Sequence, residues 1–371
     1  MDLSTFSLPH RLLAASFLLL PLFLLTGCGN AGKNEPETKV RGLVDTVGFA
    51  HEAWQMDSLM NRIRRLEGDS LQRWEGGPAW RVCISPHDDY TYVGYLYPAV
   101  LNRVKTPLVI LFGVAHKARL LHLRDRLVIG TWPAYHGPWS SIPVSPLREE
   151  IFSRLDTSLY TVNDSMMTIE HSLEALLPWL QYYDRHVTIL PILVPYMSYE
   201  RLERTGKALA EAIQQVMQQH HLTWGRDYSI AISTDAVHYG DEDWGGKNYA
   251  PYGTDAAGLK KAVAHEHEII DNCLAGPLSP ARIKRFTEYT VQKDDYMTYK
   301  WTWCGRYSVP LGLLTAWHLQ QITGTPPLSG TFVGYRNSID HTPLPVNDLH
   351  MGVTAPAHDH HWVGYAALGY E

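Results

Sequence analysis

Cysteine is scarce in this sequence, with four in 371 residues. A domain held together by disulfide bonds needs a much denser set, so a disulfide scaffold is excluded. Charged residues make up only 19% of the chain and hydrophobic residues 45%, which excludes a disordered or low-complexity protein. The net charge of −6 lacks the positive excess of most nucleic-acid-binding proteins, so no nucleic-acid partner is expected.

The chain also lacks a hydrophobic run long enough for a comfortable membrane span. Its most apolar stretch, residues 12–25, has 14 uncharged residues, whereas a spanning helix needs about 20. Arg11 precedes this stretch and small residues follow it, which is the layout of a secretory signal. Residues 25–28 read Leu-Thr-Gly-Cys and resemble the bacterial lipobox, which implies cleavage before Cys28 and lipid attachment to its thiol.

These features divide the chain into three expected parts. Residues 1–27 are expected to form a lipoprotein signal peptide, 28–44 the lipidated Cys28 and a polar tether, and 45–371 one domain. The protein would then be exported and anchored by lipid to a bacterial membrane, on its periplasmic or cell-surface face. An uncleaved N-terminal anchor is the alternative. Three further cysteines follow, an odd number, so at least one is free or metal-bound; they are Cys83, Cys273 and Cys304.

Apolar runs and helical repeats alternate through the rest of the chain. Continuous apolar runs predict strands at residues 81–85, 108–112, 126–131, 188–194 and 229–233, with two more after residue 331. Apolar residues at helical spacing predict helices at 56–66, 93–104, 171–182, 198–219, 255–274, 279–293 and 310–322. This alternation predicts an α/β fold, and continuous apolar strands imply a sheet covered on both faces. We expect a single large domain with a mostly parallel or mixed sheet flanked by helices.

Polar side chains of a kind that binds ligands follow three of the predicted strands. Any one of them alone is a common surface residue, but ligands of open α/β sheets bind beyond the carboxyl ends of the strands. We therefore expect a shared site there. Its members are His87, Asp88 and Asp89 after the first strand, His116 after the strand at 108–112, and Asp235 and His238 after the strand at 229–233.

Cys304 precedes the predicted helix at 310–322. A helix N-terminus lowers the pKa of a thiol and favours the thiolate, which binds metals; an inert, buried cysteine is the alternative. Two imidazoles and one thiolate are sufficient for a metal ion. Sets of this size occur in catalytic zinc sites and, with a carboxylate, in non-haem iron sites, while the soft thiolate also admits copper.

Six short motifs occur along the chain in a particular order. They are PHDDY at 86–90, GVAHK at 113–117, EHSLE at 170–174, PILVP at 191–195, STDAVHYG at 233–240 and CGR at 304–306. This series resembles the Memo family, whose bacterial members are called AmmeMemoRadiSam system protein B. The resemblance implies a fold similar to that of class III extradiol dioxygenases.

The resemblance also implies a site and an activity. The metal ligands would be His87, His116 and Cys304. Asp235 and His238 would line the pocket as acid–base partners, with His171 nearby. The metal would be iron or copper, with zinc possible, and the activity a metal-dependent, dioxygenase-like oxidation of a small molecule. Radical-SAM and AMMECR-type proteins are the implied functional partners.

The first motif departs from the family pattern, because Asp88 and Asp89 replace an Ala-Gly pair. The two carboxylates either lie near the metal, where they could form hydrogen bonds with its ligands, or face solvent. Together with Tyr90 and Arg306 they are expected pocket residues. Lys117 also replaces a second histidine. A non-catalytic surface lipoprotein that binds metal or a small ligand is the alternative function.

Three other groups invite a functional interpretation. The run His-Glu-His-Glu at 265–268 is expected to be a solvated helix face, and the run at 358–361 an adventitious metal binder. Ser233, His238 and Asp235 could be read as a hydrolase triad, but the sequence lacks the GxSxG motif that usually presents such a serine.

Overall fold

The computed structural model describes residues 39–371 of the chain. The expected signal peptide, Cys28 and most of the tether lie outside these residues. Within 39–371, no helix combines the length and the apolar character that a membrane crossing requires. The fold begins before the expected boundary at residue 45, because strand β1 (Val40–Arg41) pairs with β5 (Ala134–Tyr135). Strand β6 (Ile142–Pro143) completes this small sheet.

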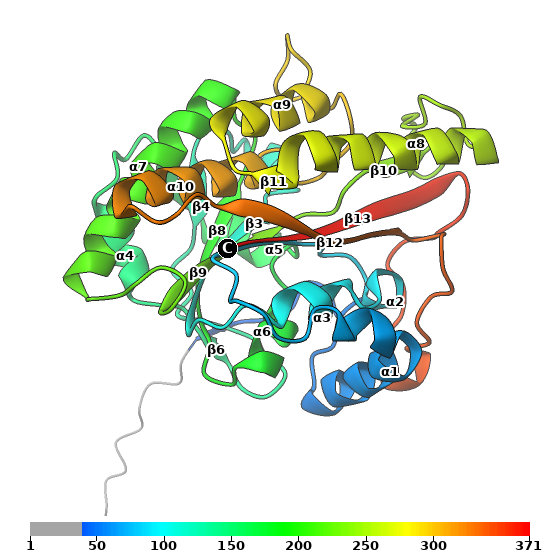
Figure 1. Ribbon diagram of the computed structural model, residues 1–371, viewed down its shortest axis with the longest axis horizontal. Coiled ribbons are helices and arrows are strands. Elements are labelled where there is room, and N and C mark those ends of the chain that lie inside the picture. The colour runs from blue at the N-terminus through cyan, green and yellow to red at the C-terminus, as the bar shows by residue number, and fades with distance from the viewer. Residues whose placement is uncertain (1–38) are drawn as a thin grey trace, which may run out of the picture. The chain divides into compact units, whose positions relative to one another are not determined.

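A large mixed sheet runs through the middle of the domain (Figure 1). Four parallel strands form its centre, in the order β2 (Val82–Ser85), β9 (Tyr228–Ser233), β3 (Leu108–Val114) and β8 (Thr188–Val194). Antiparallel strands continue from β2, in the order β13 (His361–Tyr370), β12 (Ser329–Asn337) and β11 (Gly276–Pro277). Beyond β8 lie β4 (Leu127–Ile129) and β7 (Tyr160–Val162), while β10 (His238–Gly240) pairs with β13.

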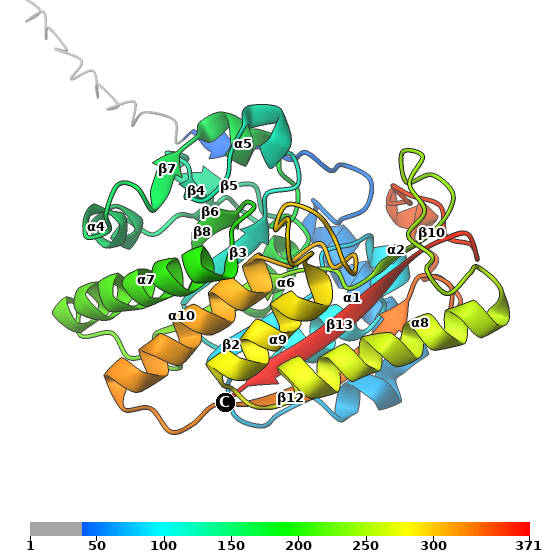
Figure 2. The same cartoon turned by 90° about the horizontal axis from the view of Figure 1, so that it is seen from above.

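Helices cover both faces of this sheet (Figures 1 and 2). One face carries α7 (Tyr199–Gln219), α8 (Ala256–Ile269), α9 (Pro280–Thr290) and α10 (Ser308–Thr323). The other face carries α1 (Ala53–Gln72), α2 (Tyr90–Val93), α3 (Leu96–Leu101) and α6 (Leu177–Tyr183). Helix α4 (Leu147–Ser153) contacts α7, and α5 (Asp164–Ile169) contacts β4. The predicted α/β fold with a mixed, two-sided sheet is confirmed.

The central strands are buried on both faces because their side chains alternate between two hydrophobic cores. In β3, Leu108, Ile110 and Phe112 pack in the core beneath α7 and α10. Val109 and Leu111 pack in the other core, with α3 and α6. This alternation explains why the strand is a continuous apolar run and not an alternation of apolar and polar residues.

The three cysteines of the described residues are all free. Cys83 belongs to one core and Cys273 to the other, so the sheet lies between them. A disulfide requires Cα atoms within about 7 Å, and these two residues therefore do not pair.

Four predicted helices, α3, α6, α8 and α9, are shorter than expected. Helix α3 covers only part of residues 93–104, and α9 ends at Thr290. Helix α6 begins only at Leu177, so the prediction of a helix from residue 171 was wrong. The carboxylate of Glu170 accepts the backbone N–H groups of His171 and Ser172, and such local bonds compete with a helix. Helix α8 ends at Ile269, and its last predicted turn is the π-helical segment Ile270–Leu274. Two other helical turns, Ala118–Leu121 and Asn347–Leu349, lie in loops.

Helix α10 packs closely on the sheet, because it is apolar on nearly every side and most of its residues are buried. A glycine allows the closest approach. A Cβ atom at Gly312 would lie 2.5 Å from Cδ1 of Ile232 in β9. The loop before α10 carries Cys304, so this contact also determines where the thiol lies.

The first prediction tests this contact. Replacing a helical glycine by alanine normally stabilises a helix by about 1 kcal/mol. We expect Gly312→Ala instead to lower the free energy of unfolding by about 1–3 kcal/mol, because the new methyl group overpacks the core. Gly68→Ala in α1 is the matched control, because a Cβ atom there meets nothing within 4 Å. Urea denaturation of both variants measures the effect, and equal stabilisation of both would contradict the packing argument.

Candidate metal centre

Three neighbouring parallel strands bring the predicted site residues together. Strands β2, β9 and β3 are adjacent, and their carboxyl ends lead to His87, Asp235 and His116. Cys304 arrives from the loop before α10. Gly305 lets this loop touch the end of β9, because a Cβ atom there would lie 2.2 Å from Oγ1 of Thr234.

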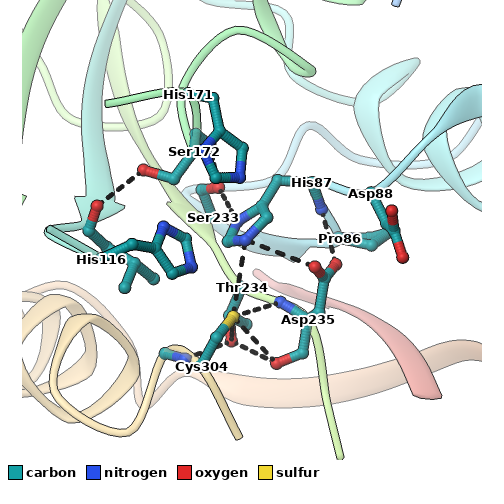
Figure 3. A network of polar contacts seen from close by, with 12 residues as sticks. Pro86, His87, Asp88, His116, His171, Ser172, Ser233, Thr234, Asp235 and Cys304 are labelled. Carbon is teal, nitrogen blue, oxygen red and sulfur yellow. Dashed lines mark hydrogen bonds and ion pairs between the residues drawn. The ribbon is translucent and has the colours of Figure 1, made fainter. Parts of the chain in front are cut away.

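His87, His116 and Cys304 form a compact group of metal-binding atoms. One ring nitrogen of each histidine and the sulfur of Cys304 all lie within 4.8 Å of one another. Figure 3 shows the two rings and the thiol around a common point. His87 and Cys304 are buried, so water does not compete freely for a metal ion at this position.

The ring of His87 is oriented by a hydrogen bond from its Nδ1. The Ser233 hydroxyl donates to the carbonyl of Ser172, so its oxygen accepts from Nδ1–H of His87, at 2.7 Å. Nε2 therefore carries the lone pair, and it lies 3.5 Å from Sγ of Cys304. Burial, followed by the charge of His116, lowers the pKa of His87 well below its usual range. The ring is thus neutral, the form that binds metals.

His116 is oriented in the same way by Glu170. Its Nδ1 lies 2.9 Å from Oε1 of Glu170, and its backbone N–H donates to Oε2 at 2.7 Å. Burial opposes protonation of this ring, but Glu170 and then Cys304 raise the pKa of His116 to about 10. A carboxylate bound to one ring nitrogen and a metal to the other is a common arrangement.

Glu170, His116 and His171 form a second possible ligand group. We favour the first group, because the Glu170 carboxylate already accepts four N–H groups, from His116 Nδ1 and from the backbones of His116, His171 and Ser172. Burial opposes ionisation, yet His116 lowers the pKa of Glu170 to about 2. Glu170 therefore holds the loop and the ring, a role that the sequence analysis missed because it took the following residues for a helix.

Asp235 connects two members of the group. Its Oδ1 accepts the backbone N–H of His87 at 2.9 Å, and its own backbone N–H donates to Sγ of Cys304 at 3.0 Å. Burial, then the charge of Asp88, raises the pKa of Asp235 well above its usual range. Burial likewise raises the pKa of Cys304, while hydrogen bonding to His116 lowers it.

His171 lies against the rings of His87 and His116, and His238 lies near enough for the charge of His116 to act on it. The ring of His171 stacks on that of His116, with the centroids 4.8 Å apart. Nδ1 of His238 lies 3.2 Å from the carbonyl oxygen of Thr302. Burial, followed by the charge of His116, lowers the pKa of each of these two histidines to about 4. Both rings are therefore neutral at physiological pH.

The comparison with known proteins agrees with this geometry. A family model described as Memo-like protein matches residues 54–345, which is well over half of the chain. The chain belongs to the Memo family. This family is related to proteins with an extradiol-dioxygenase-like fold.

Curated Memo-family relatives match a shorter region. A MEMO1 family protein of Aquifex aeolicus is 30% identical over 162 residues, which cover 43% of this chain and 54% of the relative. A MEMO1 family protein of Thermotoga neapolitana is 28% identical over 166 residues, with the same coverage. The chain thus spans about half the length of the curated relatives it matches.

The two aspartates that depart from the Memo pattern lie on the side of the centre towards β13. Asp88 accepts the Tyr365 hydroxyl at 2.6 Å. Asp89 is buried and accepts both the backbone N–H and the hydroxyl of Thr354. Burial, then the charge of Asp88, raises the pKa of Asp89 to about 8. Neither aspartate is simply a solvated surface group.

The two other expected pocket residues have different surroundings. Tyr90 lies in the core, where its hydroxyl donates to the carbonyl of Ala175. Arg306 lines a small cavity together with His116 and Cys304. Only Arg306 of these two therefore faces the space beside the centre.

The run at 265–268 differs from the expected solvated face. His265 and Glu268 do form a partly exposed pair, 3.1 Å apart. Glu266, however, is fully buried and accepts the indole N–H groups of Trp301 and Trp303, at 2.6 and 2.8 Å, and the backbone N–H of Val237. Glu266 thus holds the segment that precedes Cys304. The sequence analysis missed this role because Glu266 lies in a run of polar residues that was taken for a solvent-exposed face.

The run at 358–361 contributes one member of a surface group. His360 lies 2.7 Å from Oδ1 of Asp241 and 3.7 Å from Oε1 of Glu242. His361 instead begins β13 and stacks on Trp244. The group at His360 is exposed and separate from the centre.

The second prediction concerns Glu170. We expect Glu170→Gln to weaken metal affinity about 10- to 100-fold, because the carboxylate no longer orients His116. Metal titration of the purified variant measures this. Glu150→Gln, which alters an exposed carboxylate paired with His220, should bind metal like the unmodified protein. Unchanged affinity in Glu170→Gln would show that the His116–Glu170 bond is dispensable.

The third prediction uses the pH dependence of stability. Burial raises the pKa of Glu266 from its ordinary value of 4.5 to about 7. Between these values the unfolded chain releases this proton while the folded protein keeps it, so the contribution of Glu266 to stability falls as pH rises. We expect this decrease in the unmodified protein and not in Glu266→Gln. Parallel stability curves for the two proteins between pH 4.5 and 7 would contradict the assignment.

Proposed function

We propose that this protein is a metal-dependent oxidoreductase that acts on a small molecule. One observation carries the proposal: two imidazoles have Nδ1 engaged by protein groups and share a compact group with a buried thiol. The ligands are His87, His116 and Cys304. Iron or copper is the preferred metal, because an oxidoreductase needs a redox-active ion; zinc is a further candidate, because imidazole and thiolate also suit it.

A bound metal would supply Lewis acidity and, if it is iron or copper, electron transfer. Three protein ligands leave room in its coordination shell for a substrate atom. The protein contributes a preorganised set of ligands. Ser233 and Glu170 hold the two rings, and Asp235 holds His87 and Cys304 through its backbone and side chain.

Two neutral histidines would move protons beside the ligands. Nδ1–H of His238 donates to the carbonyl of Thr302, so Nε2 is the atom that accepts a proton from a substrate hydroxyl. His171 has a side chain 35% exposed, so it can pass a proton to solvent. General acid–base catalysis of this kind typically contributes about 10²- to 10⁴-fold to a rate.

The fourth prediction separates catalysis from capture of a metal or ligand. After anaerobic loading with Fe(II) or copper, we expect oxygen consumption with a panel of phenolic compounds. His238→Gln should retain the metal but lower turnover about 10²-fold or more. His360→Ala is the control on the surface group and should change neither property.

Two results would contradict the catalytic proposal. One is inactivity of the unmodified protein across metals and phenolic compounds. The other is a rate in His238→Gln and His171→Gln equal to that of the unmodified protein. The first result, with stoichiometric metal still present, would favour a non-catalytic metal-binding role, and the second would contradict the proton-transfer roles of the two histidines.

The exported location is a separate part of the proposal. It rests on the apolar stretch at 12–25 and the Leu-Thr-Gly-Cys sequence at 25–28. We propose lipid attachment at Cys28 and a bacterial membrane location. Intact-mass analysis of the membrane fraction should show a chain that begins at a diacylated Cys28, whereas a chain that retains Met1 would contradict this.

A further inference from the structure

Arg306 is a buried cation without an acidic partner. It lies two residues after Cys304 and is 3% exposed. Among the described residues, no carboxylate forms an ion pair with it; Nη2 donates to the carbonyl of Met297 at a long 3.4 Å, and the hydroxyls of Tyr299 and Tyr307 lie within reach of the guanidinium. Burying a charge is costly unless a partner compensates for the lost water.

Aromatic rings provide part of that compensation. The guanidinium carbon lies 3.4 Å from the ring centroid of Tyr299, 4.6 Å from that of Tyr307 and 5.5 Å from that of Tyr196. Cation–π contacts use the faces of a guanidinium group. Nε is buried with no hydrogen-bond partner, and the backbone acceptor of Nη2 lies at a long 3.4 Å. The Nε–Nη edge of an arginine matches a carboxylate, which accepts two parallel N–H bonds from it.

Arg306 also stands between the metal-binding atoms and the surface. A small cavity of about 40 Å³ is lined by His116 and Cys304, and an outer cavity of about 520 Å³ by Arg119 and Lys247. Both cavities share three lining residues, namely Tyr196, Tyr299 and Arg306. The outer volume lies within the usual range for small-molecule sites.

The charged residues that line the outer cavity are all positive. Arg119, Lys247 and Arg306 line the outer cavity, and no carboxylate does. The nearby carboxylate of Asp295 is engaged by the backbone N–H of Met297 and the hydroxyl of Thr298. A cleft lined by cations raises the local concentration of anions and speeds their arrival.

We propose that Arg306 binds the carboxylate of a small, flat, unsaturated substrate and holds it beside the metal-binding atoms. The tyrosine rings would contact the flat body of the molecule. The substrate class is therefore an aromatic or conjugated carboxylate. The role of the bound molecule as a substrate rests on the proposed function. Binding of its carboxylate requires no metal and no turnover.

Binding to the metal-free, full-length protein tests the inference. Benzoate is the probe, and benzamide is its neutral counterpart of the same shape. Isothermal titration should show benzoate binding at least 10-fold more tightly than benzamide. Arg306→Gln should weaken benzoate binding at least 10-fold, while Arg306→Lys should retain part of it, because it keeps the charge and loses the paired donors.

Arg103→Gln is the matched control. Arg103 is also a buried arginine stacked on a ring, with its guanidinium carbon 3.3 Å from the centroid of Trp80, but it has a carboxylate partner in Glu371. Its replacement should leave benzoate affinity unchanged. Thermal unfolding, measured on each variant, identifies a loss of binding that is caused by misfolding.

The outcomes distinguish this inference from the proposed function. Equal affinity for benzoate and benzamide, no benzoate binding, or unchanged binding in folded Arg306→Gln would overturn it. Inorganic phosphate binding as tightly as benzoate would overturn the requirement for a flat carboxylate. Arg306-dependent benzoate binding in a protein that proves inactive with every metal would support this inference while contradicting the proposed oxidoreductase.

Discussion

One short loop determines which nitrogen atoms the two histidines present at the centre. Glu170 accepts Nδ1–H of His116, and the carbonyl of Ser172 accepts the hydroxyl that in turn holds His87. Both rings are therefore oriented by residues 170–172, although they follow different strands. Without these bonds either ring could turn its other nitrogen towards the thiol. The loop itself is held by the Ser172 hydroxyl, which donates to the carbonyl of Val114 at the end of β3.

The ionisable groups around the centre differ between its two sides. Towards β13 lie the carboxyl groups of Asp88, Asp89 and Asp235, whose pKa values are all raised, primarily by removal from water. Towards the end of β8 lies the cavity that Arg306 lines. A raised pKa favours the neutral carboxyl, so the first side carries little charge, whereas Arg306 attracts an anionic molecule to the second.

The sequence alone predicted those parts of the site that follow directly from strand order. His87, His116 and Asp235 come together because β2, β9 and β3 are parallel neighbours, and continuous apolar runs identify such strands. The short strands β1, β5, β6, β7, β10 and β11 were missed, because two or three residues carry too little pattern.

The residues that support the site were harder to predict. Glu170 was missed because the apolar pattern after it resembles a helix. Glu266 was missed because its neighbours His265 and Glu268 are polar, and only the position of Trp301 and Trp303 in space explains its burial. That Arg306 lacks an acidic partner depends on every residue around it, which no local pattern records.

X-ray absorption spectroscopy of the zinc-loaded protein tests the metal centre most directly. The account predicts one sulfur neighbour at about 2.3 Å and nitrogen neighbours at about 2.0 Å. It also predicts that the sulfur contribution disappears in Cys304→Ser. A spectrum of the unmodified protein that contains only nitrogen and oxygen neighbours would contradict the assignment of His87, His116 and Cys304 as the metal ligands.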